Sequence, residues 1–413
     1  MIKDEVYDLI VIGAGAAGMI ASITAAKDKK RVLLLEKLAQ VGAKLKATGG
    51  GRCNLSNTLS ADEFMSKFGR DGRFMQDALK AFTREDMQDF FNSIGVETHA
   101  PDGFRIFPTS HSSSTILDAL LKTMKDLNIK VLTSQRVKQI LKETDNFEIK
   151  TSNASFSSKN IIVATGGLGY PTLGAEGDGF ELTKPFNHST TELFPAMMPL
   201  HTKEDWISRC RADTISKVTM KVDMKKHKKL SAFGDLIFTK KGIRGPVVLD
   251  FAREITPLIE KYGEVPTLIN LTKGKNEDEL LKDLKNTQAS NQDANILDLV
   301  KNILPEALSN EILKICNISN ELKLKDIDGI KKEKLLKTLS WTPLTINGHE
   351  GFKMAMITRG GIKLNECDPK TMQSKLVDGL YFCGEVMNID GPCGGYNLQW
   401  SFSSGYLAGK LLN

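Results

Sequence analysis

The sequence predicts an α/β fold built around a parallel sheet, and three features of its first 36 residues support this. A short apolar run, Val6 to Ile12, suits a strand in the middle of a sheet. It leads directly into a glycine-rich turn, Gly13 to Gly18, and then into a helix expected from about Ala16 to Lys27. A second apolar strand, Arg31 to Glu36, ends in an acid 18 residues after Gly18.

The glycine turn has the spacing of a phosphate-binding turn. Gly13 allows the tight turn, Gly15 has no Cβ and lets a pyrophosphate approach, and Gly18 lets the helix lie close to the strand. The helix N-terminus offers free N–H groups and partial positive charge to phosphates. Glu36 is placed to meet a ribose diol, which favours FAD or NAD over NADP. The pattern therefore predicts a dinucleotide site; the alternative is a glycine turn without a ligand.

Length and composition set broad limits. At 413 residues the chain exceeds one ordinary core, so we expect two or three domains. The net charge of +6 is small for this length, so we expect no nucleic-acid partner. No apolar run approaches the roughly 20 residues that span a bilayer, and the first strand begins too early for a signal peptide. The six cysteines form no CxxC pair, which indicates reduced thiols, a cytoplasmic location and no metal site.

A second glycine-rich segment follows the acidic strand. Three consecutive glycines, Gly49 to Gly51, suit a backbone pressed against a flat or charged ligand. Beside them, Arg52 is a candidate for a phosphate contact and Asn54 for a hydrogen bond to a ring edge. The alternative is a flexible surface loop, but the position after the acidic strand favours the cofactor edge.

The rest of the N-terminal region alternates helices and strands. We expect a helix over 74–94, a hairpin around Pro101 to Phe104, a helix from Ser112 to Asp126 begun by capping serines, and a buried strand from Lys130 to Thr133. A three-stranded antiparallel meander over 136–159 then leads into an apolar strand that ends in Ala164-Thr-Gly-Gly167.

The middle of the chain differs in pattern. Two prolines within 193–200 indicate a connection, and we place a boundary near 190. We expect strands at 218–222 and 236–238, a turn at 242–246 that starts a helix, and polar helices over 276–337. The charged residues of these helices are most simply a solvated face, with nucleic-acid or partner binding as the alternative. No second strand–GxGxxG–helix unit occurs here, so we expect no NAD(P)H domain of the usual kind.

The C-terminal region returns to features that suit a cofactor. Residues 353–362 read as a strand with a charged glycine turn, 379–385 as a strand ending in Gly-Glu, and 390–399 as the glycine-rich start of a helix to about Leu411. A carboxylate at a strand end can bind a ribose or ribityl hydroxyl. A helix N-terminus stabilises negative charge, such as that on the N1/C2=O edge of a reduced flavin.

Three long motifs carry a resemblance: GAGAAG (13–18), ATGGGRCNLSN (47–57) and GLYFCGEVMNIDGPCGGYNLQWSFSSG (379–405). They resemble the bacterial BaiN/RdsA-type NAD(P)/FAD-dependent oxidoreductases, a family of aminoacetone oxidase-like flavoproteins. Shorter matches at 193–200, 234–246 and 357–362 extend the resemblance over nearly the whole chain. The chain departs from the family pattern at Cys383 and Cys393; Cys393 either takes part in redox chemistry or packs against the flavin.

The resemblance implies an α/β fold with a Rossmann-like FAD-binding domain of the two-dinucleotide-binding-domain flavoprotein type, an inserted β-rich, barrel-like domain and a small helical domain. We expect residues 1–190 plus 350–413 to form the FAD domain, 191–275 the β-rich domain, and 276–349 a helical subdomain that ends in a linker.

The motifs and the resemblance together select residues for noncovalent FAD binding. They are Gly13, Gly15, Ala16, Ala17, Gly18, Glu36, Lys37, Lys44, Gly49, Gly50, Gly51, Arg52, Cys53, Asn54, Val137, Ala164, Thr165, Gly166, Gly384, Glu385, Asp390, Gly395, Asn397 and Leu398.

Catalytic residues are harder to select. Arg359 suits a substrate carboxylate or oxyanion, and an ordinary turn ion pair is its alternative. His349 and Tyr396 are candidates for a general base. We expect an enzyme that passes a hydride between a small-molecule substrate and FAD, with O2 or another acceptor reoxidising the flavin.

Three alternatives to this function stay open. They are an NAD(P)H-dependent reductase in which the nicotinamide is a transient reductant, a tRNA-modifying flavoprotein, and a flavin-binding sensor without catalysis. The sequence leaves the oligomeric state, monomer or dimer, undecided.

Overall fold

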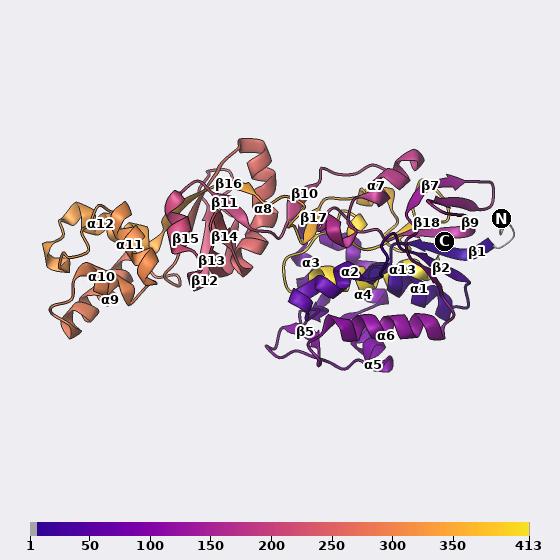
Figure 1. The fold of residues 1–413 in the computed structure, drawn as a ribbon, viewed down its shortest axis with the longest axis horizontal. Helices are drawn as coiled ribbons and strands as arrows, with labels where there is room; N and C mark the ends of the chain where they lie inside the picture. Colours follow the sequence, from indigo (N-terminus) through magenta and orange to yellow (C-terminus); the bar gives the residue numbers. More distant parts are fainter. Residues whose placement is uncertain (1–5, 413) are drawn as a thin grey trace. The chain divides into compact units, whose positions relative to one another are not determined.

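The computed structural model describes residues 6–412, which form two units (Figure 1). Unit 1 comprises the described residues up to Pro195 and from Met356 onward, and unit 2 comprises Ala196–Ala355. Unit 1 is thus assembled from both ends of the chain. The finer division into three domains, with boundaries near 190, 275 and 349, stays a prediction.

Unit 1 is built on a seven-stranded sheet. Its strands are β1 (Val6–Ile12), β2 (Val32–Leu35), β6 (Lys130–Leu132), β7 (Val137–Lys142), β8 (Phe147–Thr151), β9 (Ser155–Val163) and β18 (Leu380–Phe382). The order is β6-β2-β1-β9-β8-β7, and β18 pairs with β9 off this path. The pairs β6–β2, β2–β1, β1–β9 and β9–β18 are all parallel, which explains the apolar character of their strands. The predicted parallel sheet is confirmed.

The predicted antiparallel meander is also confirmed, with one difference. Strands β7, β8 and β9 pair antiparallel in sequence order. The third meander strand and the strand that ends before Ala164 are one continuous element, β9, rather than two. Its first half pairs with β8, its second half pairs with β18, and β1 runs beside both halves.

Helix α13 (Tyr396–Gly409) packs directly on helix α1 (Ala16–Lys27), and Figure 1 shows the two side by side. A Cβ added at Gly405 would lie 2.4 Å from the carbonyl oxygen of Ala17, and one at Gly409 would lie 2.5 Å from that of Ala21. The two backbones therefore approach more closely than any side chain allows.

The N- and C-terminal segments contain further helices and strands, and most of them are short. They are α2 (Ala43–Ala47), β3 (Ser56–Asn57), α3 (Ala61–Ser66), α4 (Gln76–Ala81), α5 (Arg84–Ser93), β4 (Thr98–His99), β5 (Arg105–Pro108), α6 (Ser113–Asp126), α7 (Asp178–Thr183), β10 (Phe194–Ala196) and β17 (Ile357–Arg359). The predicted hairpin is confirmed as the antiparallel pair β4–β5.

The single helix predicted over 74–94 is wrong. The chain forms α4 and α5 with a break at Phe82 and Thr83. The hydroxyl of Thr83 accepts a hydrogen bond from the N–H of Asp86 at 3.1 Å, and the Asp86 carboxylate accepts one from the N–H of Thr83 at 2.9 Å. This capping box starts a new helix. The apolar spacing continues through the break, so the pattern alone did not reveal it.

Two smaller expectations also fail. The strand predicted as buried near Lys130 is β6, which lies at the edge of the sheet. Ser112 occupies the N-cap position of α6 but makes no side-chain capping bond. The hydroxyl of Ser113 instead donates to the carbonyl oxygen of Lys46 at 2.7 Å and ties α6 to helix α2, which precedes the glycine-rich loop.

Unit 2 contains a closed antiparallel barrel, as predicted. Its strands, in barrel order, are β11 (Leu200–Thr202), β14 (Gly242–Arg244), β13 (Ser231–Phe238), β12 (Thr214–Val222), β15 (Val265–Asn270) and β16 (Thr342–His349). The turn predicted at 242–246 is wrong in its first half, because Gly242–Arg244 forms strand β14. This strand pairs with β11 and β13 and is needed to close the barrel. Helix α8 (Pro246–Tyr262) begins at Pro246, as predicted.

Four helices pack on the barrel, which confirms the predicted helical character of 276–337. They are α9 (Glu277–Ser290), α10 (Ile296–Lys301), α11 (Glu306–Ile315) and α12 (Gly329–Ser340). Their buried residues, such as Leu280 and Leu335, belong to the same hydrophobic cluster as Val218 in the barrel. Within residues 6–412, no helix has both the length and the apolar character needed to cross a bilayer.

The close approach of α13 to α1 gives a first prediction. Replacement of Gly405 by Ala should destabilise unit 1 by about 1–3 kcal/mol, because the new methyl group would collide with the Ala17 carbonyl. The matched control is Gly329→Ala at the start of α12, where an added Cβ meets nothing within 4 Å. Urea unfolding should separate the two variants; equal midpoints would contradict the packing.

Candidate functional site

The carboxyl ends of four parallel strands lie at one edge of the unit 1 sheet. Gly13 follows β1, Glu36 follows β2, Ala164 follows β9, and Cys383 leads from β18 into Gly384. Ligands of open α/β sheets bind at such an edge. The topology therefore gathers segments that are up to 371 residues apart in the sequence.

The first glycine turn has the predicted geometry. Gly13 has a φ of +104°, and a Cβ there would lie 2.5 Å from the carbonyl oxygen of Ala164. A Cβ on Gly18 would lie 2.0 Å from the carbonyl oxygen of Gly13. A Cβ on Gly15, by contrast, would meet no atom within 4 Å. Gly13 and Gly18 are thus required by packing, whereas Gly15 faces open space.

The N-terminus of α1 is available to an anion. Gly15 is its N-cap, no side chain caps the helix, and its first turn contains no acid. Ala16 is half-buried and Ala17 is buried at the first two helical positions. Uncapped N–H groups and the positive end of the helix dipole suit a phosphate group.

Glu36 is held next to this turn. Its two carboxylate oxygens accept hydrogen bonds from the N–H of Ala14 and the N–H of Leu38, each at 2.9 Å. The first bond ties the end of β2 to the glycine turn after β1. The carboxylate is half-buried and keeps acceptor capacity for a hydroxyl donor.

Lys37 is engaged in a charge cluster that the sequence did not reveal. Its ammonium group pairs with Glu176 at 3.0 Å and with Asp178, and Arg136 pairs with the same two carboxylates. Hydrogen bonds from Lys37 and Arg136 lower the pKa of Glu176. The neighbouring Val137 is buried in β7. No local spacing connects 37, 136 and 176–178, so only the fold reveals this cluster.

The predicted glycine loop lies next to α2. Gly49, Gly50 and Gly51 have φ values of 58°, 65° and 88°, and a Cβ on Gly50 or Gly51 would meet no atom within 4 Å. The Arg52 guanidinium lies 5.6 Å from the Phe107 ring centroid. Three left-handed residues in a row form an exposed backbone surface of the kind predicted for this loop.

Two residues at the end of this loop have structural contacts. Burial raises the pKa of the Cys53 thiol to about 12, so it is not a thiolate at neutral pH. The Asn54 amide, oriented to satisfy its partners, donates to Ser56 and Ile106 and accepts from the N–H of Gly395 at 3.0 Å. Asn54 therefore joins this loop to the start of α13, and its predicted contact with a ring edge stays a prediction.

The C-terminal segment adds a second glycine turn to the edge. Gly384 has a φ of 76°; its N–H donates to the Ser404 hydroxyl at 3.0 Å, and its carbonyl oxygen accepts from the Trp400 indole at 3.2 Å. Glu385 pairs with Lys44 at 2.6 Å and accepts a hydrogen bond from the N–H of Thr358 at 2.9 Å. The Lys44–Glu385 pair links the N-terminal and C-terminal loops.

The loop before α13 is braced internally. The Asn397 side chain accepts from the N–H of Gly391 at 2.8 Å and donates to its carbonyl oxygen at 3.0 Å. A Cβ on Gly395 would lie 2.4 Å from the carbonyl oxygen of Ser56. Asp390 and Leu398 flank this loop and are half-buried.

Two residues near β9 support the binding of a ligand. The Thr165 hydroxyl is buried and has no hydrogen-bond partner within residues 6–412. A Cβ on Gly166, which has a φ of 71°, would meet no atom within 4 Å. A buried orphan hydroxyl beside open backbone is the arrangement expected where a polar ligand completes the site. The residues at this edge thus fit a dinucleotide cofactor.

The three catalytic candidates have different surroundings within their own units. Arg359 is half-buried at the end of β17, one residue after Thr358. Tyr396 is 4% exposed, and its ring centroid lies 4.9 Å from that of Phe64, which favours a packing role. His349 belongs to unit 2, where its Nδ1 accepts from the N–H of Gly351 at 3.0 Å and burial lowers the pKa of its imidazole.

Thr358 is a further residue that the sequence did not single out. Its hydroxyl accepts from the N–H groups of Leu168 and Gly169, at 2.7 and 3.2 Å, and so fixes the loop after β9 against β17. All six cysteines are free. Burial raises the pKa of Cys383, which argues against a thiolate at this position.

Comparison with known proteins adds a family to this geometry. A family model described as "HI0933-like protein Rossmann domain" matches residues 7–411. The chain belongs to this family. The match covers nearly the whole described chain, and the resemblance to BaiN/RdsA-type oxidoreductases is confirmed.

Two relatives are similar to this chain over nearly their full length. A Clostridium scindens protein named "3-dehydro-bile acid delta(4,6)-reductase" is 28% identical over 402 residues, 97% of this chain and 97% of that protein. An Escherichia coli K12 protein named "Ribosomal RNA dihydrouridine synthase" is 29% identical over 409 residues, 99% of this chain and 98% of that protein.

A solved structure supports the fold. A 3-ketosteroid delta1-dehydrogenase from Sterolibacterium denitrificans aligns with a TM-score of 0.54 and 11% identity, covering 98% of this chain and 99% of that chain. The chain is an oxidoreductase with a Rossmann-type FAD-binding domain.

The contrast between Gly15 and Gly18 gives a second prediction. Gly15→Ala should leave the stability of the apoprotein within about 0.5 kcal/mol, because the new methyl group meets open space. It should weaken FAD binding by about tenfold or more, roughly 1.4 kcal/mol, because the methyl group occupies the approach of the pyrophosphate. Thermal melting of the apoprotein and FAD titration measure the two effects.

Gly18→Ala is the matched control. It should destabilise the apoprotein itself by about 1–3 kcal/mol, because the methyl group would collide with the Gly13 carbonyl. If Gly15→Ala bound FAD as tightly as the parent protein, the assignment of this turn to the pyrophosphate would be wrong.

Proposed function

We propose that this oxidoreductase binds FAD noncovalently along the carboxyl edge of the unit 1 sheet. The observation that carries the proposal is the combination at one edge of an open glycine turn, an uncapped α1 N-terminus and a buried Thr165 hydroxyl without a partner. The Glu36 carboxylate beside the turn adds the acceptor that a ribose requires.

The two ends of the chain hold different parts of the cofactor in this proposal. Backbone N–H groups of 13–18 bind the pyrophosphate and Glu36 binds the adenosine ribose. Gly384 and Glu385 serve the ribityl chain, and residues 395–398 the pyrimidine side of the ring. The Lys44–Glu385 ion pair and the Asn54–Gly395 hydrogen bond keep these two halves together.

When bound, FAD supplies hydride exchange at its N5 atom. The protein positions the cofactor and the substrate and supplies the electrostatic field around them. The N-terminus of α13, with Gly394 and Gly395 before it, directs N–H groups and positive potential towards developing negative charge. Arg359 is our candidate for orienting the substrate, because it follows Thr358, whose N–H is bonded to Glu385.

We further propose that the enzyme works in the reductive direction. The names of the two full-length relatives, a reductase and a dihydrouridine synthase, describe the addition of hydrogen to an organic molecule. The net reaction consumes one NAD(P)H and one proton for each carbon–carbon double bond that is saturated, and it releases NAD(P)+. The opposite direction is the oxidation of a small molecule with O2 as the acceptor. The experiment in the next paragraph distinguishes the two directions.

The third prediction tests this direction. Anaerobic mixing of the FAD-loaded protein with NADH or NADPH should bleach the flavin absorbance band, and a substrate with an electron-poor double bond should restore it. Stopped-flow absorbance measures both steps. The competing result is that neither nicotinamide bleaches the flavin while an amine or hydroxy acid does; this would support the oxidative direction. A flavin that nothing reduces would support a sensor.

The fourth prediction tests the C-terminal half of the cofactor site. Glu385→Gln should raise the Kd for FAD about tenfold, since a hydrogen bond to a charged group contributes about 1.5–3 kcal/mol. The matched control is Glu181→Gln in α7, whose side chain is 78% exposed. Isothermal titration with FAD compares them, and equal affinities would remove Glu385 from the site.

A second candidate function is the reduction of a base in RNA. The similarity to the Escherichia coli protein favours it, and so does the distribution of charge in unit 2. The small net charge of the whole chain predicted no nucleic-acid partner. A net charge summed over the chain does not show, however, how the lysines are distributed between the two units.

A further inference from the structure

The excess positive charge of the protein belongs almost entirely to unit 2. Residues 196–355 contain 27 Lys and Arg against 22 Asp and Glu, whereas the rest of the chain contains 29 against 28. The net charge of +6 is therefore concentrated in the inserted unit.

Four of these lysines occupy one turn. Lys225, Lys226, Lys228 and Lys229 lie in the connection between β12 and β13, and all four are exposed. Within residues 6–412, no carboxylate lies within 4.0 Å of any of their ammonium groups. Like charges this close together repel one another. The turn therefore attracts an anion, because a bound anion relieves this repulsion.

Aromatic rings stand beside the basic turn. His227, between the two lysine pairs, packs edge-on against Tyr262 with ring centroids 5.9 Å apart. Tyr262 is 39% exposed, and the Lys261 ammonium lies 5.3 Å from its ring centroid. Cations and aromatic rings alternate on this surface.

The surface continues along the outside of the barrel through Lys221. Register places Lys221 beside Ser231 on β13 and Leu268 on β15, and Leu268 beside Pro343 on β16. The Lys221 ammonium lies 3.6 Å from the ring centroid of Trp341. Side chains in register share one face of a sheet, so the basic turn and this tryptophan lie on one continuous surface.

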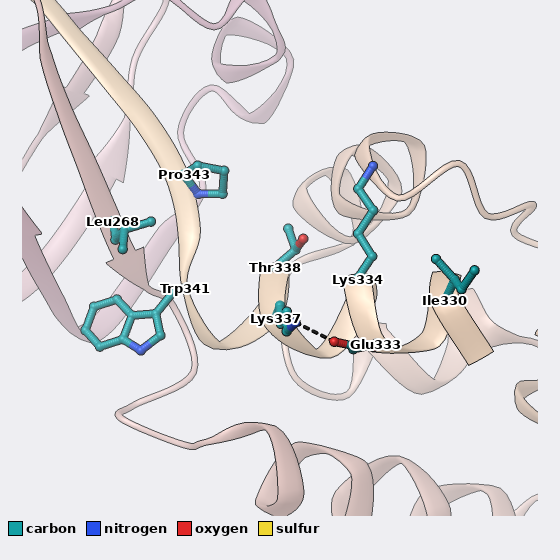
Figure 2. A pocket seen from close by; sticks show the side chains of 8 residues that line it. All are labelled: Leu268, Ile330, Glu333, Lys334, Lys337, Thr338, Trp341 and Pro343. Atoms are coloured by element: carbon teal, nitrogen blue, oxygen red, sulfur yellow. Dashed lines mark hydrogen bonds and ion pairs between the residues drawn. The ribbon is translucent and has the colours of Figure 1, made fainter. Parts of the chain in front are cut away.

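A groove and a second exposed ring complete the surface. Figure 2 shows Trp341, Leu268 and Pro343 on one side of an open groove and helix α12 on the other. Phe233 is 65% exposed on β13, in register with Thr219 and two residues along from the Lys221–Ser231 pair. The ring of Phe233 is therefore available to stack on a ligand.

This combination distinguishes between anionic partners. Lysines alone suit any polyanion, including a lipid surface. Exposed rings beside lysines suit unpaired bases, because each base can stack on a ring while its phosphate meets an ammonium group. A duplex hides its base faces, so single strands use such rings better.

We propose that the β12–β13 turn and the outer face of β12, β13 and β15–β16 bind single-stranded RNA. Lysines 225, 226, 228 and 229 contact phosphates, and Phe233 and Trp341 stack on bases. The proposal adds the surface that binds the RNA, and it rests on the second candidate function above only for the chemistry performed on the RNA.

Binding can be tested without turnover. The FAD-loaded protein should bind a fluorescently labelled 16-nucleotide oligouridylate, measured by anisotropy. With four phosphate contacts on a single strand, affinity should fall roughly 50-fold between about 50 and 200 mM salt. Absence of saturable binding at the lower salt concentration would overturn the proposal, and so would binding to phosphatidylglycerol vesicles but not to the oligonucleotide.

Variants locate the surface. Replacement of the four turn lysines by Ala should flatten the salt dependence, and Phe233→Ala should weaken binding about fivefold or more through lost stacking. The control removes four exposed lysines of unit 1, Lys30, Lys125, Lys130 and Lys138, and should bind like the parent. Equal loss in the turn variant and in the control would overturn the assignment.

The cofactor assay keeps the two proposals apart. FAD content and bleaching by NAD(P)H should be unchanged in the turn variant and in Phe233→Ala, because these residues belong to unit 2. Loss of RNA binding with intact flavin reduction supports the surface. A parent protein that binds RNA but is not bleached by either nicotinamide contradicts only the proposed direction of the reaction.

Discussion

The fold of unit 1 depends on the placement of the C-terminal segment against the N-terminal one. Strand β18 pairs in parallel with β9, and α13 packs on α1 through Gly405 and Gly409 with no side chain between the backbones. This contact brings Gly384 to within van der Waals range of α1, since a Cβ there would lie 2.9 Å from the Cβ of Ala17. Without it, the second glycine turn would not lie at the edge where the first one ends.

The electrostatics of the site follow from that placement. Two helix N-termini, those of α1 and α13, bring partial positive charge to one edge, and neither is capped by a side chain. The negative charges of the two nearby carboxylates are compensated by their own partners. Glu36 accepts hydrogen bonds from two backbone N–H groups, and Glu385 is paired with Lys44. Such an edge suits a ligand with a negative pyrophosphate and many hydroxyl groups, which is the chemistry of a flavin dinucleotide.

Sequence patterns predicted the elements whose formation depends on neighbouring residues. The β1–turn–α1 unit, the meander and the strand segments at 218–222 and 236–238 follow from apolar runs and glycine spacing, and they are found where expected. Strand β14 was predicted as part of a turn, and the sequence singled out no strand at β11, β15 or β16, because their partners in the barrel are distant in the sequence. The helix break at Thr83 was missed because a capping box overrides a continuous apolar pattern. The cluster of Lys37 and Arg136 with Glu176 and Asp178 was missed because its members meet only in three dimensions. The lysine-rich surface was missed because a net charge averages over two units.

Hydrogen exchange, compared between the apoprotein and the FAD-loaded protein, tests whether both ends of the chain close on one FAD molecule. If they do, FAD slows exchange together in 13–18, 48–54 and 384–398, and leaves the barrel strands of unit 2 unchanged. Protection confined to the N-terminal segments, with 384–398 exchanging as in the apoprotein, would contradict it.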